Sequence, residues 1–324
     1  MSAATTLTIR PAAAPAEGVA VGLFTALQDL KRQYPAHYRG RSIATQLFRR
    51  AWSQLLTSER SLAEVARRTV ATATAQVLFP GCDAGFWPHT GLREQQVAEL
   101  LRASIAETCA GAGLADATLA ALGACAEDLA ADYFGAAQAE ATLPRALDLL
   151  CRQPRAGATR PGFQRLVLTP AELHGEHCLL TAVYAYLSAD GYGAQPEVAF
   201  LAGLAHHLHN ALLPDCGFAG EMLLGEHLAP VIDTLRERAL EQLPDALADA
   251  TRAALRHHET IATPEGEAIS AGDVLDRVLD VKWRTRAAAV TDADILGDLD
   301  LVHAGPLKDF QVTLLNAYGL WTAH

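Results

Sequence analysis

The sequence is poor in aromatic side chains and modest in β-branched ones. Aromatic residues make up only 6% of its 324 residues, whereas half of the residues are apolar, and alanine and leucine dominate. Alanine and leucine are strong helix formers, while sheets draw on β-branched and aromatic residues. We therefore predict an all-α protein.

Basic residues are also scarce, and this shortage excludes some partners. The chain carries 26 Lys and Arg against 37 Asp and Glu, a formal net charge of −11. A surface of this sign repels nucleic-acid phosphates and anionic lipids. We predict no nucleic-acid and no membrane partner. The negative net charge is compatible with a small-molecule substrate, even an anionic one, because a metal ion can reverse the local charge. The oligomeric state stays open, with a homo-oligomer among the options.

The six cysteines form no closely spaced pair. No CxxC motif occurs, so neither a zinc ribbon nor a disulfide framework is indicated. No run of about 18 apolar residues suggests a membrane span. The first residues lack the basic start and apolar core of a signal peptide. We expect reduced thiols in a cytoplasmic protein.

Helical spacing of apolar residues recurs along most of the chain. The segment 153–163, QPRAGATRPGF, holds two prolines and two glycines and is the best boundary candidate. We predict a flexible N-terminus (1–16), a helical N-terminal domain of unknown role (17–152) and a second helical domain (165–324) with a C-terminal helical extension. The expected helices span 18–33, 42–56, a segment capped by Ser61 and Glu64, 92–108, 115–134, 143–151, 169–187, 197–213, 223–239, 244–259, 268–289 and 306–321.

The main functional signal is a concentration of histidines. Eight of the 12 histidines lie between positions 174 and 258, and three of them fall within the apolar stretch 201–211. A buried neutral imidazole needs a polar partner, so these histidines require a hydrogen-bond network or a metal ion. Other predicted helices also carry histidine or aspartate. The candidate metal ligands are His177, His206, His207, His227, His257, His258, Asp273 and Asp276. Imidazole and carboxylate donors suit Fe, Mn, Co, Ni or Zn, as one or two ions.

Three motifs resemble the HD-domain superfamily of metal-dependent phosphohydrolases and related oxygenases. Glu176-His177 precedes Cys-Leu-Leu-Thr-Ala-Val, residues 202–208 read AGLAHHL, and residues 269–275 read ISAGDVL. The resemblance covers residues 165–290 and implies an HD-like helical bundle with a metal site. It implies His177 and His206 as ligands, with Asp273 as the preferred late ligand and Asp276 as the second choice. It also places His227 and His257 or His258 where dinuclear members have extra histidines.

One position departs from the family pattern. The aspartate of the His-Asp pair is replaced by His207, and an imidazole does not bridge two ions as a carboxylate does. The site is then mononuclear, an altered dinuclear site, or a site that has lost its metal. A shifted alignment, in which His209-Asn210 takes the place of the His-Asp pair, is a further alternative.

The resemblance implies hydrolysis of a nucleotide or small phosphate ester by a metal-activated water. His209 and Glu259 are the candidate catalytic residues, acting as a base or by orienting neighbouring groups. One alternative is a di-iron oxygenase acting on a small molecule. The other is a non-catalytic HD-like sensor or interaction protein.

Overall fold

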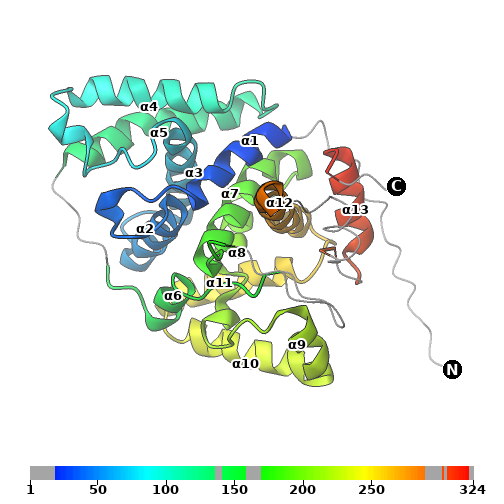
Figure 1. The fold of residues 1–324 in the computed structure, drawn as a ribbon. Helices are drawn as coiled ribbons and strands as arrows, with labels where there is room; N and C mark the ends of the chain where they lie inside the picture. Colours follow the sequence, from blue (N-terminus) through cyan, green and yellow to red (C-terminus); the bar gives the residue numbers. More distant parts are fainter. Residues whose placement is uncertain (1–18, 136–140, 158–168, 289–300, 303–304, 321–324) are drawn as a thin grey trace.

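The protein is built from α-helices and short 3₁₀ turns (Figure 1). The computed structural model describes residues 19–135, 141–157, 169–288, 301–302 and 305–320. Within these ranges no β-strand forms, and a single isolated antiparallel bridge joins Pro154 to Leu173. The all-α class is confirmed. The predicted flexible segment 1–16 and Trp321, at the end of the predicted last helix, lie outside the described residues.

The first half of the chain forms its helices close to where the sequence predicts them. They are α1 (Val21–Leu27), α2 (Ile43–Thr57), α3 (Leu62–Leu78), α4 (Glu94–Thr108), α5 (Asp116–Phe134) and α6 (Arg145–Leu150). A 3₁₀ turn, Gln28–Lys31, continues α1. The capping box predicted before α3 is confirmed, because the Ser61 side chain accepts the Glu64 N–H and the Glu64 carboxylate accepts the Ser61 N–H.

The second half surrounds one buried helix. Its helices are α7 (His174–Tyr192), α8 (Pro196–Ala205), α9 (Gly217–Leu224), α10 (Leu228–Leu240), α11 (Asp245–His258), α12 (Pro264–Ala288) and α13 (Lys308–Ala317). Nearly every residue of α7 is buried, because α12, α8 and α2 all pack against it. A helix in such a central position must be apolar on all sides. Among the described helices, none is long and apolar enough to cross a membrane.

The helices before and after the segment 153–163 share buried surface. Helix α2 packs on α7 and α3 packs on α8, and one cluster of buried apolar side chains includes residues of both halves. Residues 158–168 lie outside the described part of the chain. The division into two domains at this segment stays a prediction.

Three predicted helices differ from the structure. Helix α7 begins at His174 rather than at 169, because the chain just before it lies alongside residues 153–155, with the His174 N–H donating to Gln153 O at 3.0 Å. The helix predicted over 223–239 is interrupted. A 3₁₀ turn, Gly225–His227, separates α9 from α10, and Gly225 adopts a φ of +52° that suits glycine.

The helix predicted over 197–213, which would have carried three histidines, also ends early. Helix α8 stops at Ala205, the backbone of His207 leaves the helical conformation, and a 3₁₀ turn follows at Leu208–Ala211. Polar side chains here bond locally, since His206 Nδ1 lies 2.6 Å from Gly203 O and His207 Nδ1 lies 2.7 Å from Asn210 Oδ1. Such local bonds compete with the continuation of a helix.

Two glycines allow α8 and α12 to approach α7 closely. A Cβ atom on Gly203 would lie 2.7 Å from Ala182 Cα, and a Cβ atom on Gly272 would lie 2.7 Å from Thr181 O. Both distances are shorter than side chains tolerate. His206 follows Gly203 by one helical turn, and Asp273 directly follows Gly272. The close approach therefore brings both residues to His177, one turn before Thr181 on α7.

Candidate metal centre

Three side chains from three helices converge at the buried centre. His177 comes from α7, His206 from the end of α8 and Asp273 from α12. His177 Nε2 lies 3.2 Å from His206 Nε2 and 3.1 Å from Asp273 Oδ1. His206 Nε2 lies 4.0 Å from the same carboxylate oxygen. The expected pairing of His177 and His206 with Asp273 is thus present in the geometry.

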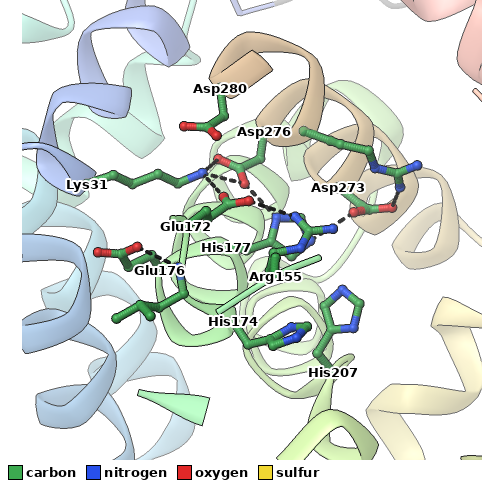
Figure 2. A network of polar contacts seen from close by, with 12 residues as sticks. Lys31, Arg155, Glu172, His174, Glu176, His177, His207, Asp273, Asp276 and Asp280 are labelled. Atoms are coloured by element: carbon green, nitrogen blue, oxygen red, sulfur yellow. Dashed lines mark hydrogen bonds and ion pairs between the residues drawn. The ribbon is translucent and has the colours of Figure 1, made fainter. Parts of the chain in front are cut away.

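The outer ring nitrogens fix which atoms carry protons. His177 Nδ1 lies 2.6 Å from Asp276 Oδ2, and that carboxylate also accepts a bond from Lys31 Nζ (Figure 2). Gln28 Nε2 donates to the same carboxylate. His206 Nδ1 lies 2.6 Å from a carbonyl oxygen, which can only accept. Burial, the largest cause, holds the pKa of His206 well below its ordinary value, so this ring is neutral. The proton of the His206 ring therefore sits on Nδ1, and the lone pair of His206 Nε2 faces His177 Nε2.

His207 adds a further donor to this group. Each of His177, His206 and His207 offers one ring nitrogen, and these three nitrogens lie within 4.8 Å of one another. Asn210 Nδ2 donates to Leu213 O, which turns Asn210 Oδ1 toward His207 Nδ1. His207 therefore donates from Nδ1 and is left with a lone pair on Nε2.

The donor set fits a divalent transition-metal ion. His177 Nε2 lies 3.2 Å from His206 Nε2 and 3.1 Å from Asp273 Oδ1, and lone pairs at these distances repel each other unless a cation or a proton lies among them. Metal–nitrogen bonds of about 2.1 Å place neighbouring donor atoms roughly 3.0–3.4 Å apart, which these distances match. The outer nitrogens donate to a carboxylate and to a carbonyl, as metal-bound histidines do. The three histidines are thus positioned to hold an ion, and Asp273 Oδ1 lies 3.1 and 4.0 Å from the Nε2 atoms of His177 and His206.

Asp276 lies on the other side of His177, in a buried ionic network. Glu172, His177 and Asp276 form a second group with the spacing of metal ligands. The ammonium of Lys31, fully buried, already bonds both carboxylates of this group, at 2.8 Å from Asp276. Burial disfavours the charged form of Lys31, but the surrounding carboxylates outweigh it and raise its pKa above the ordinary value. Asp276 therefore orients His177 while Lys31 supplies the positive charge.

Two arginines border the centre. Arg277, one turn after Asp273 on α12, bonds the Asp273 carboxylate and Leu301 O. Burial opposes ionisation of Asp273, yet Arg277 and His177 hold the pKa of that carboxyl well below its usual range. Arg155 bonds Glu172 at 3.0 Å. Both arginines line the same cavity as His206, His207 and Asp273, whose volume is about 280 Å³.

The other candidate residues divide into two groups. His258 and His209 line the cavity, with the His258 ring 5.3 Å from the His206 ring. His227 is exposed on its 3₁₀ turn, and His257 bonds Thr263 Oγ1 at 3.0 Å outside the cavity lining. Glu259 has 55% of its side chain exposed and bonds Arg236 at 2.8 Å. The structure therefore brings His209 and His258 to the centre and leaves His227, His257 and Glu259 apart from it.

Sequence reasoning missed several residues around the centre. His174 lines the cavity one helical turn before His177, a spacing that the sequence does display. No motif marks Lys31, Arg155, Glu172 or Arg277. Arg155 sits inside the stretch interpreted as a linker, and Lys31 comes from a helix far earlier in the chain. Only tertiary packing reveals their roles.

Comparison with known proteins adds no further constraint. The chain matches no protein-family model, no curated protein and no solved structure. The functional interpretation therefore depends on the residues of the site.

Proposed function

We propose that this protein is a metal-dependent phosphohydrolase, resembling the HD superfamily, that acts on a small phosphate ester. The observation that supports it is the meeting of the Nε2 atoms of His177 and His206 with Asp273 Oδ1, within 3.1–4.0 Å. This donor set lies at a cavity that is also lined by Arg155 and Arg277. Guanidinium groups match phosphate oxygens in both charge and geometry.

A divalent ion held by these residues would polarise a phosphoryl oxygen and lower the pKa of a water molecule. The residues of the chain supply the remaining functions. Arg277 keeps the Asp273 carboxylate ionised and in place. His209 presents a buried Nδ1 atom that has no hydrogen-bond partner among the described residues, and burial lowers its pKa to about 4. This nitrogen is thus available to accept a proton from the attacking water. The bond from water oxygen to phosphorus forms as the ester bond breaks, and the alcohol leaves with a proton from solvent.

The experiment compares His206→Ala with His89→Ala. Purified proteins are analysed for bound metal and assayed with p-nitrophenyl phosphate in the presence of Mn²⁺, Co²⁺, Ni²⁺ or Zn²⁺. We expect His206→Ala to lose metal and at least 100-fold in activity, because removal of a ligand dismantles the site. His89 is exposed on the 3₁₀ turn Trp87–His89, so His89→Ala should retain both. Equal metal content in the two variants would contradict the placement of the site.

The same donor set favours a second candidate, an iron-dependent oxygenase. Two histidines and one carboxylate with open positions are typical of non-haem Fe(II) sites. Iron as the co-purifying metal, together with substrate-dependent O₂ consumption and no phosphate release, would select this alternative over hydrolysis.

A further inference from the structure

Beside the metal centre, the cavity contains polar side chains whose hydrogen-bonding capacity is not fully used. His174, Asp215 and Glu221 all line it together with the metal-binding histidines. The His174 ring lies 5.0 Å from the His207 ring, and its Nε2 atom lies 3.6 Å from Asp215 Oδ2. These three residues, which we call the acceptor pocket, belong to three different segments of the chain.

His174 is the most unusual member of the acceptor pocket. Only 1% of the residue is exposed, yet neither ring nitrogen has a hydrogen-bond partner among the described residues. Buried polar groups in native proteins almost always have a partner, so such a side chain points to a ligand or a water molecule. A neutral imidazole offers one donor and one acceptor.

Asp215 and Glu221 supply acceptors beside it. Each oxygen of Asp215 accepts one backbone N–H, from Ala156 and from Gly217, both at 2.8 Å. These bonds fix the carboxylate and leave further lone pairs toward the cavity. The carboxylate of Glu221 is partly buried and has no hydrogen bond or ion pair within the described part of the chain. Burial, and then repulsion from Asp215, raise the pKa of Glu221.

The other carboxylates of the cavity are already paired with cations. Lys31 and Arg155 bond Glu172, and Arg277 bonds Asp273. Arg32 and Arg284 bond the remaining lining carboxylate, that of Asp280. Asp215 and Glu221 are the lining carboxylates that form no ion pair with a lysine or arginine among the described residues, so negative charge gathers at this side of the cavity. A second phosphate group would be repelled there, whereas hydroxyl or ammonium donors would find acceptors.

We propose that the acceptor pocket binds the alcohol part of a phosphomonoester whose alcohol carries hydrogen-bond donors and no further phosphate. The inference deepens the proposed phosphohydrolase function and depends on it, since the metal centre would hold the phosphoryl end. A cavity of about 280 Å³ suits a ligand no larger than a small sugar phosphate or amino-alcohol phosphate.

The test compares four probes on the metal-supplemented protein. Ribose 5-phosphate presents hydroxyls, phosphoethanolamine presents an ammonium, p-nitrophenyl phosphate has no donor on its alcohol part, and ATP adds phosphates. Hydrolysis is measured by phosphate release and binding by calorimetry. We expect the first two probes to bind at least tenfold more tightly than the other two, and to give the higher kcat/KM.

Glu221→Gln tests the pocket without disturbing the metal ligands. Its amide keeps the shape of the side chain but loses the charge, so we expect about a tenfold rise in Kd and KM for phosphoethanolamine and a smaller rise for ribose 5-phosphate. p-Nitrophenyl phosphate should be unaffected. Glu226→Gln is the matched control, because Glu226 is exposed and lies outside the cavity lining. His174→Phe, which fills the site without a polar atom, should weaken both donor-bearing probes.

The outcomes separate this inference from the function on which it depends. If all four probes bind equally, or if Glu221→Gln affects them equally, the acceptor pocket holds only water and the inference fails, while hydrolysis of p-nitrophenyl phosphate still supports the function. In another outcome, the donor-bearing probes bind selectively and Glu221→Gln weakens their binding, but none of the probes is hydrolysed. The acceptor pocket is then supported and the hydrolase function is contradicted. Preferential binding of ATP would overturn the charge argument.

Discussion

At the scale of single residues, the orientation of His177 is decided by a chain of buried contacts. Asp276 accepts from His177 Nδ1 and is itself bonded by Lys31 Nζ and Gln28 Nε2, at 2.8 and 2.7 Å. The side chains of His177, Asp276 and Lys31 are all fully buried. A carboxylate in such surroundings stays ionised only because a cation neutralises it. Lys31 therefore acts as a positioning residue for the metal centre.

Replacing Lys31 should weaken both the fold and the centre. Lys31→Met leaves Glu172 and Asp276 without their shared ammonium, and removing one partner of a buried ion pair costs about 3–5 kcal/mol in the free energy of unfolding. Metal affinity should fall roughly 10–100-fold, because Asp276 then orients His177 less firmly. Denaturant unfolding and metal titration measure the two effects.

Lys308→Met is the control for this change. Lys308 is only partly buried at the start of α13, so its replacement should alter stability by less than about 0.5 kcal/mol. If the Lys31→Met and Lys308→Met proteins had the same free energy of unfolding and the same metal affinity, Lys31 would not be a positioning residue for the centre.

At the scale of helices, the centre depends on how closely α8 and α12 lie against α7. Gly203 and Gly272 face the α7 backbone near Thr181 and Ala182. Their missing side chains let the histidines and Asp273 meet within a few ångströms. The early end of α8 has a second effect, because His207 leaves the helical path and can join His206 at the same centre.

Gly272→Ala should force α12 away from α7. The added Cβ atom would lie 2.7 Å from Thr181 O and 3.1 Å from Ala185 N, both backbone atoms that cannot move aside easily. Overpacking of this kind costs about 1–3 kcal/mol. Since Asp273 moves with α12, metal affinity should also fall. Thermal unfolding and metal titration measure these changes.

Gly123→Ala provides the comparison on α5. The nearest atom to its added Cβ would be Arg102 Cγ at 3.8 Å, an ordinary contact. Alanine in a helix interior should then stabilise the protein by about 0.5–1 kcal/mol. If both alanine variants were stabilised alike, the close approach of α12 would not limit the site.

At the scale of the whole molecule, the two halves of the chain contribute to one centre. Lys31 and Gln28 come from the 3₁₀ turn after α1, and both bond Asp276 of α12. Helices α2 and α3 pack on α7 and α8, and the Glu176 carboxylate of α7 accepts a bond from Ser42 Oγ at the start of α2. The N-terminal helices thus support the histidine-bearing helices directly.

Metal binding should therefore stabilise the entire chain. An ion that binds only the folded state at 100 times its Kd adds about 2.7 kcal/mol, which raises the unfolding temperature by several degrees. Because the halves share buried contacts, we expect one calorimetric transition that shifts as a whole when EDTA is exchanged for metal. Two transitions, of which only one shifts, would show instead that the N-terminal helices unfold independently.

The sequence by itself determined the helical class and the capping box before α3, and it named the three histidines of the centre among its candidate metal ligands. Composition, local periodicity and residue type suffice for these features, because helices form from contacts within a few residues. The resemblance of three motifs to a known superfamily also implied His177, His206 and Asp273, the side chains that meet at the centre.

Only the tertiary structure decided which candidates come together. It placed His227, His257 and Glu259 away from the centre, ended α8 before His207, and brought Lys31 and Arg155 to the site from distant segments. These outcomes depend on close backbone approach at Gly203 and Gly272 and on the neutralisation of buried charges. Both are long-range effects of packing, for which a local pattern carries no signal.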